Sequence, residues 1–169
     1  IPENIQIGKI PPQAHELEQA VLGAILLERD AFDIAIEIIN TECFYLEFHQ
    51  NIFRAMKTLS QWSKPVDSLT VAQEMRKQET LPTDGMYQLS KLTSSVVSSA
   101  NIEEHCRIIQ EKYLLREFIN LGGNLVAEGY ADSTDVFEMI NKHEQKFTQL
   151  TTSNLKSGYT SIDNDEMKN

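Results

Sequence analysis

The feature that most constrains the fold is a long helical pattern from Asn101 to about Glu128. A helix of this length would extend about 42 Å, which is more than a compact head of about 100 residues requires. Its second half carries two apolar stripes that together cover an arc of about 160°, wider than one packing partner usually covers. These stripes consist of Leu114, Phe118, Leu121 and Leu125 on one side and Leu115, Ile119 and Val126 on the other.

A final helix is predicted from Asp135 to Leu150, after a short turn that begins at Gly129. The two helices would form a helical hairpin. The final helix offers one apolar stripe, whereas the long helix presents two, so apolar surface is left over. We therefore predict that the chain self-associates through the hairpin. The stripe of the final helix contains Val136, Ile140, His143, Phe147 and Leu150.

Residues 12–100 predict a compact head of several helices, because apolar residues recur at steps of three and four. Asp67 or Ser68 is well placed to cap one of these helices, since Pro65 ends the preceding one. No segment alternates cleanly enough to be a strand, and the predicted fold class is all-α. The predicted helical stretches run from Pro12 to Leu27, Ala31 to Ile39, His49 to Trp62, Ser68 to Met75, and through Leu89 and Leu92, before a loop at Thr93–Ser99.

The two ends of the chain differ in composition from the rest. Proline and glycine interrupt residues 1–11, which we expect to form an extended leader. Residues 151–169 are rich in Ser, Thr and Asn, which predicts a flexible linker toward a domain outside this sequence. The predicted organisation is therefore a leader (1–11), a head (12–100), a hairpin (101–150) and a linker (151–169).

Charge and composition exclude several classes of protein. The net charge of −10, from 15 basic and 25 acidic residues, disfavours tight binding of nucleic acid by this chain alone. No apolar run approaches the roughly 18 residues of a membrane span, and no secretory signal pattern is present. The two cysteines imply no disulfide framework, so we expect a cytoplasmic protein.

No motif for nucleotide chemistry or catalysis is present. The dipeptide Gly8-Lys9 is followed by Ile10 and lacks the hydroxyl and upstream glycine of a phosphate-binding loop. The pair Gly122-Gly123 lies inside a predicted helix with no preceding strand, unlike a dinucleotide fingerprint. We predict no catalytic residues and no cofactor in these residues.

Metal ligation is also disfavoured. Cys43, His49, His105 and Cys106 can be combined on paper into a zinc site, but no Cys-x-x-Cys pair exists. The pair His15-x-x-Glu18 could supply half of a di-iron site. A charge that stabilises the helix N-terminus is the favoured interpretation of this pair.

Six short strings occur in order along residues 11–130, and together they resemble the N-terminal domain of DnaB-type replicative DNA helicases. The strings are Pro11-Pro12-Gln13, Glu16-x-Glu18-Gln19-Ala20-Val21-Leu22-Gly23, Phe44-Tyr45-x-x-x-His49-x-x-Ile52-Phe53-x-Ala55, Pro65-Val66-Asp67-x-x-Thr70, Ser99-Ala100-Asn101-Ile102 and Glu111-Lys112-x-x-x-Arg116.

The resemblance implies a function for the whole parent protein. Hairpins of such helicases pair between subunits, and three pairs form a collar above a hexameric ring. The collar docks the C-terminal domain of primase, and a helicase loader is a further expected partner. A motor domain beyond the linker would use ATP and Mg to unwind duplex DNA in the 5'–3' direction, while this fragment has no catalysis of its own.

Candidate interface residues follow from the pattern and the resemblance together. For subunit pairing they are Leu114, Leu115, Phe118, Ile119, Leu125, Ile140 and Phe147. For primase docking they are Glu16, Tyr87 and Gln88. A stand-alone helical adaptor of phage or plasmid type is the alternative, which a phosphate-binding loop in the gene beyond Asn169 would exclude. A helical metalloenzyme is a distant third possibility.

Overall fold

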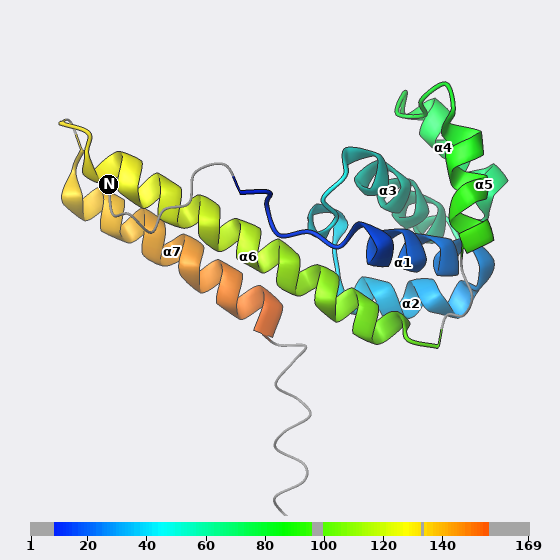
Figure 1. Ribbon diagram of the computed structural model, residues 1–169, viewed down its shortest axis with the longest axis horizontal. Coiled ribbons are helices and arrows are strands. Elements are labelled where there is room, and N and C mark those ends of the chain that lie inside the picture. Colours follow the sequence, from blue (N-terminus) through cyan, green and yellow to red (C-terminus); the bar gives the residue numbers. More distant parts are fainter. Residues whose placement is uncertain (1–8, 96–99, 133, 156–169) are drawn as a thin grey trace, which may run out of the picture.

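The computed structural model describes residues 9–95, 100–132 and 134–155, and it is helical throughout, with no strand in these ranges. The predicted all-α class, a multi-helix head followed by a long hairpin, is confirmed (Figure 1). The elements are α1 (His15–Leu27), α2 (Arg29–Ile38), the 3-10 turn η1 (Thr41–Cys43), α3 (Glu47–Gln61), α4 (Ser68–Lys77), α5 (Gly85–Ser95), α6 (Ile102–Gly129) and α7 (Val136–Leu155).

The head is built around one continuous apolar core. Helices α1 to α5 surround it, and the first half of α6 closes it against α1 and α2. At its centre Phe44 and Phe53 are fully buried, with ring centroids 5.0 Å apart, and Phe32 lies 5.9 Å from Phe53. Such tilted aromatic contacts add to the free energy that burial of the rings contributes.

Local sequence signals explain where some helices begin. Asp67 caps α4 as predicted: its Oδ1 accepts hydrogen bonds from the amides of Leu69 and Thr70, both at 2.9 Å. Pro12, in contrast, does not open α1, which begins at His15. The carbonyl of Pro12 accepts a hydrogen bond from Arg116 on α6 at 2.8 Å, which ties the leader to α6.

Two helices end later in the structure than the sequence predicts. The expected loop at Thr93–Ser99 is helical as far as Ser95, and the remainder lies outside the described residues. Helix α7 runs to Leu155 rather than ending at Leu150. The Thr151 hydroxyl donates to the carbonyls of Phe147 (3.1 Å) and Thr148 (3.0 Å). Its polar group is therefore bound to the backbone of α7, and the helix continues through this residue. The rest of the predicted linker, from residue 156, lies outside the described residues.

The hairpin projects from the head because α6 belongs to both. Its first half lies in the head and its second half extends away beside α7 (Figure 1). At 28 residues, α6 is long enough to serve both regions without a break. None of the described helices is both long and apolar enough to cross a bilayer.

Candidate functional site

Polar contacts along one edge hold the two helices of the hairpin together. Glu117 on α6 pairs with Lys146 on α7 at 3.1 Å, and Glu128 pairs with both Lys142 and His143. The Glu128 Oε2 to His143 Nε2 distance is 3.1 Å. The hydrogen bonds from Lys142 and His143 lower the pKa of Glu128, so this carboxylate stays charged where an isolated one would begin to be protonated.

The turn between the helices is fixed by side chains as well. The Thr134 hydroxyl donates to the carbonyl of Glu128 at 2.6 Å. Asp135 caps α7, because its Oδ1 accepts from the amides of Phe137 (2.9 Å) and Glu138 (3.1 Å). Side chains therefore bind backbone groups at the end of α6 and at the start of α7.

Apolar packing between α6 and α7 uses only part of the available surface. Leu121 on α6 and His143 and Leu150 on α7 are buried side chains of the hairpin's outer part. Phe118 and Phe147 touch at a centroid distance of 5.7 Å, yet about half of the Phe147 side chain, 52%, stays exposed. One edge of the α7 stripe therefore packs on α6, while the other faces outward.

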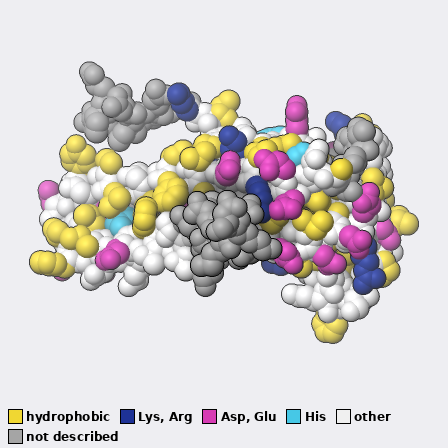
Figure 2. Space-filling model, turned by 90° about the horizontal axis from the view of Figure 1, so that it is seen from below, with side chains coloured by type: hydrophobic (Ala, Val, Ile, Leu, Met, Phe, Trp, Pro, Cys, Tyr) yellow, Lys and Arg dark blue, Asp and Glu magenta, His cyan; other side chains and the backbone are white. Residues whose placement is uncertain are grey.

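We call the remaining apolar surface the open face, and it holds most of the predicted pairing residues. Ile119 is the most exposed of these residues, at 60%. Leu114 differs from the others because it is half-buried at the margin. Figure 2 shows apolar side chains spread along the hairpin, while acidic side chains gather over the head. The residues of the open face are Leu115, Phe118, Ile119, Leu125, Ile140 and Phe147.

Two exposed aromatic residues at the hairpin end extend this surface and were not predicted. Tyr130 is 72% exposed and Phe137 is 79% exposed. Tyr130 falls in the segment that the sequence marks only as a turn, and Phe137 lies beside the predicted stripe rather than on it. The sequence signal that could have found them is the aromatic side chain itself, because Tyr and Phe are enriched at protein interfaces.

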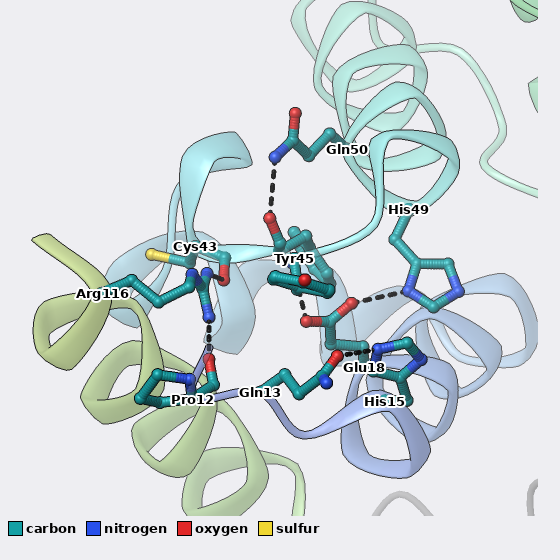
Figure 3. A network of polar contacts seen from close by, with 10 residues as sticks. Pro12, Gln13, His15, Glu18, Cys43, Tyr45, His49, Gln50 and Arg116 are labelled. Carbon is teal, nitrogen blue, oxygen red and sulfur yellow. Dashed lines mark hydrogen bonds and ion pairs between the residues drawn. The ribbon is translucent and has the colours of Figure 1, made fainter. Parts of the chain in front are cut away.

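The root of the hairpin is joined to the head by Arg116. Its Nη1 donates to the Pro12 carbonyl and its Nη2 to the Cys43 carbonyl, both at 2.8 Å (Figure 3). The guanidinium also lies over the rings of Tyr45, at 5.4 Å, and Tyr113, at 5.9 Å. One side chain therefore ties leader, η1 and α6 together through hydrogen bonds and cation–π contacts.

A buried acid lies next to this junction. Glu18 is 1% exposed, and its Oε1 accepts from the Tyr45 amide while its Oε2 accepts from Nδ1 of His49, both at 2.7 Å (Figure 3). Glu18 does lie in the first turn of α1, where a charge was predicted to stabilise the helix N-terminus, but that prediction missed its two hydrogen-bond partners. Its partners lie 27 and 31 residues away, and it joins α1 to the start of α3.

The predicted primase-docking residues lie on the surface of the head. Tyr87 and Gln88 on α5 line a pocket of about 300 Å³ together with Gln19 of α1. Tyr87 is exposed, and Gln88 donates to Asp84 at 2.8 Å. Glu16 is exposed on α1 but does not line this pocket. The structure therefore brings Tyr87 and Gln88 together, with Glu16 outside the hollow.

Metal ligands do not converge in the part of the chain that the structure describes. No group of three or more His, Cys, Asp or Glu side chains there could hold an ion. Cys43 and Cys106 are buried free thiols, and Cys43 donates to the Asn40 side chain at 3.1 Å.

Comparison with known proteins places the chain among helicase domains. The model of the DnaB-like helicase N-terminal domain matches residues 10–111. The chain is 44% identical over 158 residues to the replicative DNA helicase DnaB of Rhodothermus marinus, covering 93% of this chain and 17% of that protein. It is 34% identical over 155 residues to DnaB of Geobacillus stearothermophilus, covering 91% of this chain and 34% of that protein. The chain thus spans between about a sixth and about a third of the length of these relatives.

Solved structures agree with this placement. The N-terminal domain of DnaB helicase from Mycobacterium tuberculosis matches with a TM-score of 0.77 and 34% identity, over 83% of this chain and 99% of that one. A DnaB-like replicative helicase, described with its interactions with primase, matches with a TM-score of 0.64 and 25% identity, over 91% of this chain and 36% of that one. The chain belongs to the DnaB-like helicase N-terminal domain family.

Proposed function

We propose that this chain is the collar of a hexameric replicative DNA helicase and pairs with a second copy through the open face of its hairpin. The observation that carries the proposal is the row of exposed apolar side chains from Leu115 to Phe147 on two helices that already share a packed edge. A surface of this kind, long and apolar, marks a protein interface. Three such pairs would form the collar.

The chemistry of unwinding would take place outside these residues. Relatives of this chain are named replicative DNA helicases, and the matched part makes up only 17% of one of them and 34% of another. We place ATP and Mg, and the contact with DNA, in a motor domain that follows residue 169 in the parent protein. The net charge of −10 on this chain is consistent with a role in assembly rather than in DNA binding. The expected location is the cytoplasm.

Sedimentation velocity on the 169-residue chain tests the pairing. The unaltered chain is expected to sediment as a dimer or larger species, and Ile119→Asp is expected to shift it toward the monomer, because a charge cannot be buried at an apolar contact. Leu69→Asp is the matched control, since Leu69 is similarly exposed on α4 of the head, at 66%. Both variants should keep the helical far-UV spectrum. A monomeric unaltered chain, or equal loss in both variants, would contradict the proposal.

Docking of primase on the head is the second part of the proposal. It is supported by the exposure of Tyr87, by the pocket beside it, and by the match to a helicase described with primase. We expect the C-terminal domain of the same cell's primase to bind this chain, and Tyr87→Ala to weaken binding, with smaller losses for Gln88→Ala and Glu16→Ala. Trp62→Ala, at an equally exposed aromatic, is the control. Equal affinity of all four variants for primase would show that Tyr87, Gln88 and Glu16 are not part of the docking surface.

A further inference from the structure

A pocket of about 310 Å³ lies where the leader crosses the root of the hairpin. The leader from Lys9 to Pro12 forms one wall, and Tyr45 and Ile119 contribute others. Arg116 holds these walls in place, since it binds the Pro12 carbonyl at 2.8 Å and lies over the Tyr45 ring. The pocket is therefore a fixed feature of the junction shown in Figure 3.

This pocket is continuous with the open face. Ile119 belongs to both, and Ile10 on the leader wall is 77% exposed. A second copy lying on the open face would therefore meet the leader as well.

Helix geometry points to Tyr130. It follows Ile119 by eleven residues, about three turns, so the two side chains share one side of α6 and lie about 16 Å apart along it. A two-fold axis midway between them would exchange the two positions, placing Tyr130 of each copy at Ile119 of the other. Near that axis lie Gly122 and Gly123, where an added Cβ would meet nothing within 4 Å, so the two helices can approach closely.

We propose that Tyr130 of a second copy enters the leader pocket, so that a paired hairpin makes two such contacts. This inference rests on the proposed pairing and adds the leader to its interface. The ring would pack on Ile10 and Ile119, and its hydroxyl would meet the polar lining at Glu42 or Asn120.

Charges around the two surfaces are complementary. The hairpin end carries the acidic side chains of Asp132 and Glu138, both exposed. The pocket lining contributes two basic side chains, Lys9 on the leader and Arg116, against one acidic side chain, Glu42, so the charged groups of its lining are net positive. Opposite charges around an apolar contact favour the correct orientation of the partners.

Cysteine cross-linking tests the contact in the full 169-residue chain. An Ile10→Cys chain is mixed with a Tyr130→Cys chain under mild oxidation, and the native cysteines are buried and do not interfere. The pair is expected to form at least about ten times more linked heterodimer than a Trp62→Cys and Tyr130→Cys pair, because docking raises the effective concentration of the thiols. Trp62 is 72% exposed but does not line the pocket.

Sedimentation of the same chains separates failure of the docking contact from failure of the pairing. Dimers that cross-link no better than the Trp62→Cys pair would overturn the contact and leave the pairing intact. An unaltered chain that stays monomeric, together with variants that do not cross-link, would overturn both. In a second readout, Tyr130→Ala is expected to weaken the dimer about tenfold, as loss of an interface aromatic does, and Tyr130→Phe to weaken it less. Unchanged dimer affinity in Tyr130→Ala would also overturn the contact.

Discussion

The head and the hairpin are both helical, but they differ in how much of their apolar surface they bury. The head closes on itself around rings such as Phe44 and Phe53, which have no exposed surface. The hairpin buries only a narrow edge, which includes Leu121 and Leu150, and leaves its open face uncovered. A two-helix unit has no third layer to cover its outer faces. The head is therefore stabilised by its own core, whereas the hairpin keeps large apolar side chains exposed to solvent.

The largest effect should come from removing a ring of the head core. Phe53→Ala is expected to lower the free energy of unfolding by about 3–5 kcal/mol, because it leaves a cavity between Phe32 and Phe44. Urea denaturation followed by circular dichroism measures the loss.

A Phe-to-Ala substitution in the hairpin should destabilise the chain much less than the one in the head. Phe147→Ala, measured where the chain is monomeric, should cost less than about 1 kcal/mol, because half of that ring is already in water. Equal losses in Phe53→Ala and Phe147→Ala would show that the two regions do not differ in the way described.

Removal of the buried acid Glu18 is expected to cause the second-largest loss of stability. Glu18→Ala is expected to cost about 3 kcal/mol, since it leaves the amide of Tyr45 and the imidazole of His49 buried without their acceptor. The control is Glu103→Ala, which breaks an exposed pair with Arg107 and should change stability by about 0.5 kcal/mol or less. Similar losses in both would mean that Glu18 acts as an ordinary surface charge.

The two thiols of the head should react slowly. Burial raises the pKa of Cys43 to about 11 and that of Cys106 to about 12, from an ordinary value of 9.0. The thiolate fraction near pH 8 falls about 100-fold or more, and alkylation followed by mass spectrometry should slow accordingly. A cysteine placed at exposed Phe137 in the hairpin should react at the ordinary rate. Rapid labelling of Cys43 in the folded chain would contradict the buried head.

The same shifts predict how stability changes in alkali. Above pH 9 the unfolded thiols lose their protons while the folded ones keep them, so the unfolded state is favoured. The contribution of the buried thiols is complete below pH 9 and is lost as the pH rises toward 12. Replacement of both Cys43 and Cys106 by Ala should remove this part of the pH dependence.

The smallest effect is expected at the hairpin edge. Glu128→Gln removes the charge that pairs with Lys142 and His143, and should speed hydrogen exchange at the start of α7 without changing the head. The pKa of Glu128 is lowered in the folded chain, so its contribution is present above pH 4.5 and is lost as the pH falls. Faster exchange in the head would contradict the separation of the two regions.

Local signals in the sequence predicted much of this fold. Apolar spacing predicted the helices, and the proline, valine and aspartate at 65–67 predicted the end of α3 and the cap of α4 at Asp67. The two stripes of α6 predicted more apolar surface than α7 covers, as observed at Leu115 and Ile119. These features depend on neighbours within a few residues, which a sequence displays directly.

Contacts between distant residues could not be predicted in this way. Glu18 looks like a charge at a helix start, and only the fold shows His49 and Tyr45 beside it. Arg116 follows a helical pattern on α6, yet its partners lie 73 and 104 residues away. Tyr130 gains significance only once the leader pocket is seen at the other end of the open face.

The continuity of α6 has a mechanical consequence. The helix has no break between Ile102 in the head and Gly129 at the hairpin end, so it acts as a lever with one arm embedded in the core. A rotation imposed on the outer arm must turn the head with it, unless the helix bends. Glycine is the residue that least resists bending, and Gly122 and Gly123 lie in the outer arm, beyond Arg116. Any flexing of the lever is therefore expected between two paired hairpins, while the joint at the head stays stiff.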